Sequence, residues 1–415
     1  MLAKIRPYAA DIDIVAPPSK SYAHRLIIAA ALGEKTVTVK NVGSSADVLA
    51  TARCVEALGA KVGFSGKNVE ITGIFASERI KTAVLNCGES GSTLRFLMPI
   101  AAALGISAKF TGEGRLLSRP NEILFSLLKA HGVDANGYEI SGKLKSGDFV
   151  VDASVSSQYI TGLMLALPLI SGDSEIILKG KPVSENYIDI TFDVLDLAGI
   201  KYEKSESAIK IFGNRRFDLP SEVTCEGDWS GAAFPLVIGA ISGKAKVGGL
   251  NCNSAQGDKI IADILAQAGA NLSYDGEKYT ATKSEMRAFK ADMENCPDLA
   301  PIACVLAAKA KGESEISGVS RLKIKESDRL KAVCDMLTVA GVKFSFDGEK
   351  FKIVGGETLG GEFNGYSDHR IVMAATALAI SSSGESEISC AEATAKSYPE
   401  FFEAIAGGNN VEVVR

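Results

Sequence analysis

The sequence predicts an α/β protein of two domains built from six repeats of about 70 residues. Its 415 residues are enough for two or three domains at about 150 residues each. Two sets of helix-like segments alternate along the chain, and the glycines that end them recur about every 70 residues in each set. Short β-like runs lie between these segments. Helices and strands therefore alternate throughout, which is typical of the α/β class.

The first set of segments is apolar on all sides, which is typical of helices that are surrounded by protein. These buried helices are expected over residues 24–33, 95–105, 160–172, 231–243, 299–312 and 370–384. The second set is amphipathic and is expected over residues 51–59, 123–132, 190–199, 260–269, 330–341 and 401–407. A glycine just past a helix readily adopts the left-handed conformation that ends it, so the glycines fix the helix ends.

Pairs of β-like runs follow the amphipathic segments, for example residues 343–346 and 351–354 around Asp347-Gly348. One run, residues 4–8, precedes the first repeat, while the last repeat lacks a full strand pair. We therefore expect the N-terminal strand to complete the C-terminal domain. The domains are then residues 14–227 and residues 1–13 plus 228–415, joined by two crossings of the chain.

Composition excludes several classes of protein. With 46% hydrophobic and 23% charged residues, the chain is neither disordered nor fibrous. A net charge of −5 argues against general binding to nucleic acid. The eight cysteines are scattered without Cys-x-x-Cys, which indicates buried thiols in a reducing compartment and no zinc site. Residues 1–20 lack the apolar core that is typical of a signal peptide, and the longest apolar runs reach about ten residues, so the expected location is the cytoplasm.

Polar and basic residues gather where the helices of both sets are expected to begin. Helix N-termini carry unpaired N–H groups and the positive end of the helix dipole, which suits phosphate and carboxylate groups. Ordinary N-capping explains Ser and Asp at such positions, but the dipole disfavours cations there. The sequence therefore predicts a receptor for multiply charged anions, with these cations: Lys20, Arg25, Arg95, Arg119, Arg329, Arg370 and Lys396.

Nine short motifs occupy these positions in order along the chain. They are Pro-Ser-Lys-Ser-x-x-x-Arg at 18–25, Gly-Ser-Thr-x-Arg at 91–95, Arg119-Pro120, Ser156-Ser157-Gln158, Ser184 with Tyr187, Pro297-Asp298, Lys325-Glu326-Ser327-Asp328-Arg329, Asp368-His369-Arg370 and Ala395-Lys396. In this order they resemble the enolpyruvyl transferase family, and within it the branch that acts on shikimate 3-phosphate. The resemblance covers nearly the whole chain.

The resemblance implies a two-domain inverted α/β barrel-like fold of six repeats, with the active site in the cleft between the domains. It also implies the reaction of the shikimate pathway that leads to aromatic amino acids. The enolpyruvyl group of phosphoenolpyruvate passes to the 5-hydroxyl of shikimate 3-phosphate, and phosphate leaves by addition and elimination through a tetrahedral intermediate. No cofactor or metal is expected for this reaction, and no nucleic acid or membrane is expected as a partner. The protein is expected to be a monomer.

Matching the motifs position by position implies a role for each site residue. Shikimate 3-phosphate would be held by Lys20, Ser21, Arg25, Ser156, Ser157, Gln158, Ser184, Tyr187, Asp298 and Lys325. Phosphoenolpyruvate would be held by Lys20, Gly91, Arg119, Gln158, Arg329, Arg370 and Lys396. Among the catalytic residues Lys20, Asp298 and Glu326, Asp298 would accept the hydroxyl proton and Glu326 would protonate the methylene carbon. Two carboxyl groups in different environments are suited to such a division of base and acid.

Two departures from the family and two alternatives remain. The family usually has Asn where this chain has Glu89, and often a small or amide residue at Arg321, which leaves sensitivity to the inhibitor glyphosate open. The sister transferase that acts on UDP-N-acetylglucosamine is one alternative, but its reactive cysteine would fall within residues 111–120, which contain none. The other is a repeat-built scaffold that binds anions without turnover. Release of phosphate from phosphoenolpyruvate only with shikimate 3-phosphate would separate the three.

Overall fold

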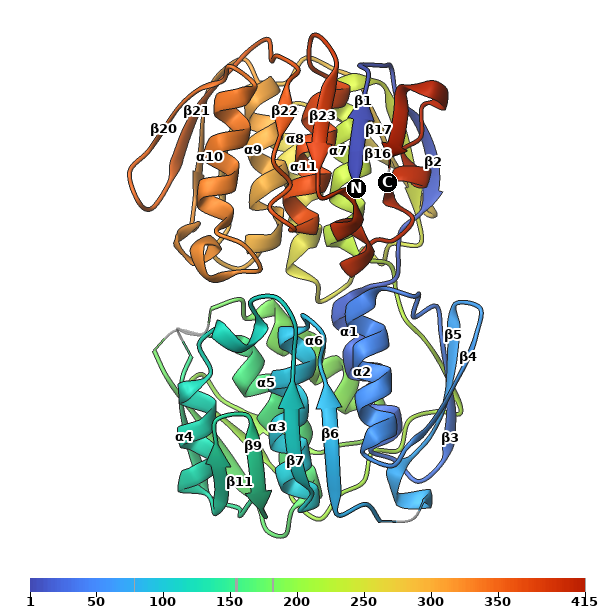
Figure 1. Cartoon of the computed structure of the whole chain (residues 1–415), viewed down its shortest axis with the longest axis vertical. Coiled ribbons are helices and arrows are strands. Elements are labelled where there is room, and N and C mark those ends of the chain that lie inside the picture. Colours follow the sequence, from blue (N-terminus) through green and yellow to red (C-terminus); the bar gives the residue numbers. More distant parts are fainter. Residues whose placement is uncertain (78, 154–155, 181–182, 415) are drawn as a thin grey trace. The chain divides into compact units, whose positions relative to one another are not determined.

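Six four-stranded sheets with one common pairing pattern make up the strands that the structure describes (Figure 1). The structure is a computed structural model, and it describes residues 1–77, 79–153, 156–180 and 183–414. Each sheet has one parallel strand pair and two antiparallel pairs. This repetition confirms the six repeats that the sequence predicts.

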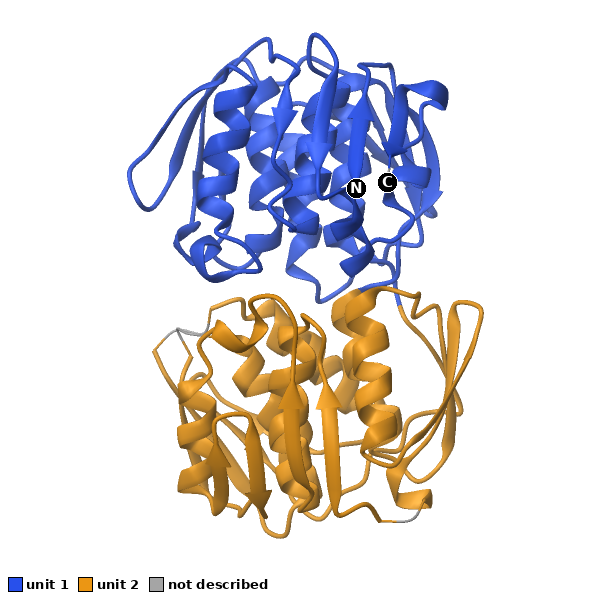
Figure 2. Ribbon diagram, viewed as in Figure 1, with its two compact units in different colours: residues 1–19, 226–415 blue, residues 20–225 orange. Residues whose placement is uncertain are grey.

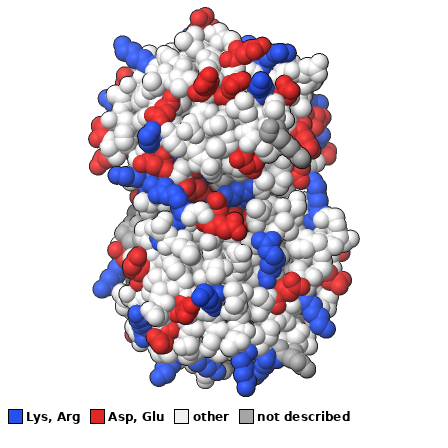
Figure 3. Space-filling view, in the orientation of Figure 1, with Lys and Arg blue, Asp and Glu red and all other residues white. Residues whose placement is uncertain are grey.

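The chain forms two compact units, which Figure 2 colours separately. Unit 1 consists of Met1–Ser19 and Glu226–Arg415, and unit 2 of Lys20–Cys225. The first crossing differs from the expected one after residue 13. Strand β2 (Asp11–Val15) pairs in parallel with β15 (Lys244–Gly248), so the chain stays in unit 1 beyond residue 13. On the face drawn in Figure 3, acidic and basic side chains are interspersed over each unit.

The described residues of unit 2 form three sheets and six α-helices. Its sheets have the orders β14-β3-β5-β4, β6-β7-β9-β8 and β10-β11-β13-β12. Its helices are α1 (Lys20–Ala31), α2 (Ala46–Ala57), α3 (Gly91–Leu104), α4 (Glu122–Ala130), α5 (Ser157–Ala166) and α6 (Asn186–Leu197). Its strands are β3 (Thr36–Lys40), β4 (Lys61–Ser65), β5 (Asn68–Thr72), β6 (Thr82–Asn86), β7 (Ser107–Thr111), β8 (Val133–Asn136), β9 (Glu139–Gly142), β10 (Asp148–Asp152), β11 (Ser174–Lys179), β12 (Tyr202–Lys204), β13 (Ala208–Ile211) and β14 (Glu222–Thr224).

Unit 1 repeats this organisation with sheets β16-β17-β15-β2, β18-β19-β21-β20 and β22-β23-β1-β24. Its helices are α7 (Trp229–Ser242), α8 (Ile261–Gln267), α9 (Ala300–Lys309), α10 (Arg329–Val339), α11 (His369–Ile380) and α12 (Phe401–Ala404). Its remaining strands are β1 (Leu2–Ile5), β16 (Asn271–Tyr274), β17 (Lys278–Thr282), β18 (Lys290–Asp292), β19 (Gly312–Ser317), β20 (Lys343–Phe346), β21 (Phe351–Gly355), β22 (Glu362–Phe363), β23 (Ser386–Ser389) and β24 (Val411–Val414).

The all-round apolar segments form the central helices of each unit, as their pattern predicts. Every residue of α7 is buried, and α3 and α11 are buried along almost their whole lengths. In unit 2, α3 and α5 approach so closely that a Cβ atom at Gly162 would lie 2.4 Å from the carbonyl oxygen of Arg95. Only glycine fits at this crossing. The helix starts that carry the polar motifs are thus held by tightly packed elements.

Strand β1 completes the sixth repeat. It lies between β23 and β24 and is antiparallel to both, with Ala3 facing Ile388 on one side and Val413 on the other. The side chains of Ala3 and Ile5 are buried in the core of unit 1. The N-terminal strand therefore supplies the partner that the last repeat lacks in sequence. Among the described residues, no helix is long and apolar enough to cross a membrane.

Candidate functional site

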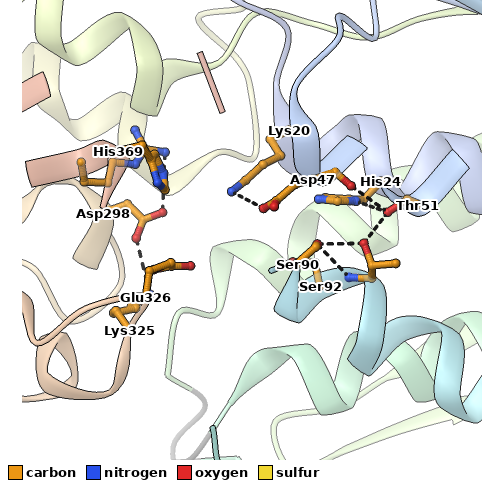
Figure 4. Close-up of polar contacts among 12 residues, drawn as sticks. Lys20, His24, Asp47, Thr51, Ser90, Ser92, Asp298, Lys325, Glu326 and His369 are labelled. Atoms are coloured by element: carbon orange, nitrogen blue, oxygen red, sulfur yellow. Dashed lines mark hydrogen bonds and ion pairs between the residues drawn. The ribbon is translucent and has the colours of Figure 1, made fainter. Parts of the chain in front are cut away.

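Lys20 and Ser21 open α1 in unit 2. The Lys20 ammonium lies 3.0 Å from the carboxylate of Asp47, at the start of α2, and only 16% of the Lys20 side chain is exposed (Figure 4). A hydrogen-bond chain runs behind this pair, from His24 Nδ1 to Thr51 Oγ1 (2.6 Å), on to Thr93 Oγ1 (2.6 Å) and to Ser90 Oγ (2.8 Å). Burial lowers the pKa of His24 to about 3, so the imidazole is neutral and structural. This row of hydrogen bonds fixes the starts of α1 and α3 relative to each other.

Arg25 is buried and donates four hydrogen bonds to protein groups. They reach Thr191 Oγ1 (2.9 Å), Thr161 Oγ1 (3.2 Å) and the carbonyl oxygens of Ser21 (2.7 Å) and Tyr187 (2.8 Å). Burial lowers its pKa to about 10. Arg25 thereby brings Ser21 and Tyr187, two residues of the shikimate 3-phosphate set, to the same place.

Arg95 takes a role that differs from the anion ligand expected from its place at a helix start. Its guanidinium donates to Gln158 Oε1 (2.6 Å), Asn121 Oδ1 (2.9 Å) and the Pro120 carbonyl (3.0 Å). The Gln158 amide in turn donates to Ser92 Oγ (3.0 Å). Arg95 thus orients Gln158, and each of its three guanidinium nitrogens donates a hydrogen bond to a neutral oxygen inside unit 2.

The N-terminus of α3 lies against the guanidinium of Arg119. Ser90 caps the helix by accepting from the Thr93 N–H (3.2 Å), and a Cβ atom at Gly91 would lie 2.9 Å from Arg119 Nη1. Glycine at this position leaves room for the arginine. The Glu89 side chain is exposed and lies against Gly114, where an added Cβ would be 2.6 Å from its Oε1.

The remaining predicted residues of unit 2 lie at the starts of α5 and α6. Ser156 and Ser157 are buried, and Ser156 caps α5 by accepting from the Gln158 N–H (3.3 Å). Ser184 is buried and has a positive φ of 55°, a conformation uncommon for a residue other than glycine. Its carbonyl accepts from the Tyr187 N–H (3.0 Å). Ser156 therefore stands directly before α5, and Ser184 stands in a tight turn just before α6.

In unit 1 three carboxylates surround the buried guanidinium of Arg329. It donates to Asp368 twice (Nε 2.8 Å and Nη2 3.1 Å), to Asp298 (2.8 Å) and to Glu326 (2.9 Å). Burial alone would lower the pKa of Arg329, but these carboxylates outweigh it and raise the pKa well above its usual value. Asp368 is also the N-cap of α11, since it accepts from the Arg370 N–H (2.9 Å). One carboxylate therefore connects Arg329 and the helix that begins with His369 and Arg370.

Asp298 stands before α9 and faces three cations. Its Oδ1 lies 2.8 Å from Arg329 and 3.5 Å from Lys325, its Oδ2 lies 3.7 Å from Arg370, and 18% of its side chain is exposed. Burial raises the pKa of Asp298, but Lys325, Arg329 and Arg370 outweigh it and hold the pKa well below its usual range. Burial lowers the pKa of Lys325. Asp298 is therefore a carboxylate at neutral pH.

Arg370 presents buried hydrogen-bond donors at the start of α11. It is 2% exposed, and its Nε and Nη1 have no hydrogen-bond partner in the part of the chain that the structure describes. Buried donors without partners are costly, and a buried guanidinium is especially so. An anion bound here would satisfy them.

Lys396 is also buried, but it ends the short helix η7 (Ala391–Lys396), and α12 begins only at Phe401, so the expectation that Lys396 opens a helix is wrong.

Asp258 in unit 1 is a buried carboxyl group that lies outside the sequence motifs. It is 6% exposed, and the Ser230 hydroxyl at the start of α7 lies within hydrogen-bonding reach of its carboxyl group. Burial and the charge of Asp298 raise its pKa to about 7, against the opposing effect of Arg370. Its position could have indicated a site residue, because Gln256-Gly257-Asp258 stands directly before an amphipathic helix, as other site motifs do.

The whole chain is similar to proteins of one activity. The family model described as EPSP synthase (3-phosphoshikimate 1-carboxyvinyltransferase) matches residues 5–405. The 3-phosphoshikimate 1-carboxyvinyltransferase of Clostridium kluyveri is 38% identical over 411 residues, which are 96% of this chain and 95% of the relative. That of Methanocella arvoryzae is 34% identical and covers 100% of both chains.

Solved structures of two enzymes share the fold. An EPSP synthase from Acinetobacter baumannii has a TM-score of 0.84 at 24% identity, with 100% of both chains covered. The enolpyruvyl transferase NikO from Streptomyces tendae has a TM-score of 0.78 at 16% identity, covering 97% of this chain and 96% of NikO. At these identities the likeness shows the fold class alone, and it is the one that the sequence predicts.

Proposed function

Since this chain belongs to the EPSP synthase family and is an enolpyruvyl transferase of the shikimate pathway, we propose how its residues perform the reaction. The 5-hydroxyl oxygen of shikimate 3-phosphate forms a bond to C2 of phosphoenolpyruvate while C3 takes up a proton. The tetrahedral intermediate then loses a proton from C3 as the bond between C2 and the phosphate oxygen breaks. The products are the enolpyruvyl ether and inorganic phosphate.

We propose that residues of both units hold each substrate in one active site. The shikimate 3-phosphate set combines residues of unit 2 with two residues of unit 1. From unit 2 it has Lys20, Ser21, Arg25, Ser156, Ser157, Gln158, Ser184 and Tyr187, and from unit 1 it has Asp298 and Lys325. The phosphoenolpyruvate set has Lys20, Arg119 and Gln158 with the N-terminus of α3 in unit 2, and Arg329, Arg370 and Lys396 in unit 1. Guanidinium groups suit this task, because they bind the oxygens of carboxylate and phosphate groups in pairs.

The two carboxyl groups beside Arg329 have different roles in this proposal. Asp298, which is ionised among three cations, accepts the proton of the attacking hydroxyl. The Lys325 ammonium lies 3.5 Å from its Oδ1 and stabilises the ionised carboxylate before the proton arrives. Glu326 delivers the proton to C3 and takes it back during elimination. Lys20, paired with Asp47, donates a hydrogen bond to the bridging phosphate oxygen as it leaves. The proton that Asp298 took from the hydroxyl passes to the released phosphate, which regenerates the carboxylate.

The observation that supports the proposal most is Arg370. Two of its buried nitrogens have no hydrogen-bond partner among the residues that the structure describes and would suit an anionic ligand, and its third lies 3.7 Å from the carboxylate assigned as the base. An anion bound to Arg370 is therefore next to Asp298, where the two reacting groups must meet.

Phosphate release tests the proposal. We expect release from phosphoenolpyruvate only when shikimate 3-phosphate is present, and none with UDP-N-acetylglucosamine. Asp298→Asn should lower kcat by about 100-fold or more, because a positioned general base contributes roughly that much, with a smaller effect on KM for shikimate 3-phosphate. Asp292→Asn, an exposed carboxylate of the same unit, is the control. If Asp298→Asn keeps kcat within about threefold of the parent, Asp298 is not the base.

A further inference from the structure

A turn without glycine at its two left-handed positions precedes the Asp368-His369-Arg370 motif. Tyr366 and Ser367 have φ values of 54° and 50°, between β22 and α11. Two successive non-glycine residues in this region are strained, and such strain persists only where the surroundings hold the backbone in place. The Asn364–Ser367 turn is therefore held by its contacts, and these contacts show what it connects.

The first contact reaches α10. The Tyr366 hydroxyl donates to the carboxylate of Asp335 and accepts from the ammonium of Lys331 (2.9 Å), and Lys331 and Asp335 form an ion pair with each other. The Lys331 ammonium also lies 5.3 Å from the centre of the Tyr366 ring. Both partners stand on the helix that begins with Arg329.

The second set of contacts reaches the segment before η7. The Gly365 N–H donates to Ser389 Oγ (3.2 Å), and the Ser367 hydroxyl donates to Cys390 Sγ (3.6 Å). Cys390 directly precedes η7, whose last residue is Lys396. At its own end the turn closes with a hydrogen bond from the Asp368 N–H to the Gly365 carbonyl (2.9 Å), directly before Arg370.

One turn thus contacts α10, leads directly into α11 and contacts the residue that precedes η7. These are the three elements that carry Arg329, Arg370 and Lys396. These are the three cations of unit 1 that the proposed function assigns to phosphoenolpyruvate. We propose that Tyr366 is a positioning residue for enolpyruvyl transfer, whose hydroxyl, bound to Asp335 and Lys331, fixes this turn and so sets the spacing of the three cations. The inference rests on the proposed function.

Steady-state kinetics of Tyr366→Phe tests it, because this change removes only the hydroxyl. We expect KM for phosphoenolpyruvate to rise about fivefold, as the loss of a hydrogen bond between partly exposed groups allows. KM for shikimate 3-phosphate should stay within about twofold, since unit 2 supplies most of that set. Asp335→Asn should act in the same direction. The double variant should be little worse than either single variant, because both remove one contact.

Tyr202→Phe is the matched control. Tyr202 also donates to an aspartate, Asp196 (3.1 Å), on the exposed surface of unit 2. Its loss should leave both KM values unchanged. The inference is overturned if Tyr366→Phe changes neither KM, if it raises both KM values in parallel, or if it lowers only the melting temperature. If the parent enzyme releases no phosphate from the two substrates, the proposed function fails first and the inference falls with it.

Discussion

Asp258 shows how one buried side chain makes the stability of unit 1 depend on pH. The charged and titratable groups that act on it are Asp298, Arg370 and Asp228, and the thiol of Cys296 lies close as well. Its pKa rises from an ordinary 3.8 to about 7 in the folded protein, chiefly through burial. The folded state therefore binds a proton that the unfolded state releases between these pH values, so stability decreases as pH rises from about 4 to about 7.

Asp258→Asn should remove this dependence, because an amide resembles the protonated carboxyl group. A difference of one pKa unit between the folded and unfolded states corresponds to about 1.4 kcal/mol. Between about pH 4 and pH 8 the free energy of unfolding of the parent protein therefore decreases by roughly 4 kcal/mol, and that of the variant does not. We expect the melting temperature of the variant, relative to the parent, to be higher at pH 8 than at pH 5. Asp263→Asn, an exposed carboxylate on the neighbouring α8, should show no such trend. Parallel pH profiles for parent and Asp258→Asn would disprove the assignment.

At the scale of the element, β1 pairs with strands that lie almost the whole length of the chain away from it. It pairs with β23 and β24, near the other end of the chain, and places Ile5 in the core while Lys4 points to solvent. A strand in the middle of a sheet contributes hydrogen bonds on both sides and buried apolar surface on one.

Ile5→Ala should therefore destabilise unit 1 by about 2–4 kcal/mol, the range for removing a buried aliphatic side chain. Lys4→Ala is the control on the same strand. Its ion pair with Glu387 is 3.5 Å long between half-exposed side chains, so its loss should cost under about 1 kcal/mol. Urea unfolding measures both. Equal midpoints for the two variants would show that β1 does not contribute to the core as described.

At the scale of the whole molecule, the chain has two compact units, and the proposed shikimate 3-phosphate set is divided between them. A ligand that contacts both units should slow local opening in both, because binding stabilises the folded form of whatever it touches. We expect saturating shikimate 3-phosphate to slow hydrogen exchange around residues 20–25 and 184–187 of unit 2 and around residues 297–299 and 325 of unit 1. Shikimate without the phosphate is the control. Protection confined to one unit would show that a single active site from both units is wrong.

The sequence by itself determined the repeats, the helices and the general chemistry of the site. Apolar periodicity and glycine at helix ends are local signals, so all twelve predicted segments contain helices in the described chain. N-caps such as Ser90, Asp328 and Asp368 are equally local. Clustered cations at helix starts predicted anion binding, and the matched motifs named the family that the comparisons then showed.

Only the tertiary structure decided what each charged side chain does. Arg25, Arg95 and Arg370 are equivalent in the sequence pattern, yet protein acceptors occupy the first two, while Arg370 keeps two buried nitrogens without partners among the residues described. The same holds for the Asp258 carboxyl, the Tyr366 turn and the place of β1. Burial, pairing and pKa depend on residues that are far apart in the chain. Arg329, for example, lies 31 positions from Asp298 and 39 from Asp368, and these residues are brought together only when the buried helices pack.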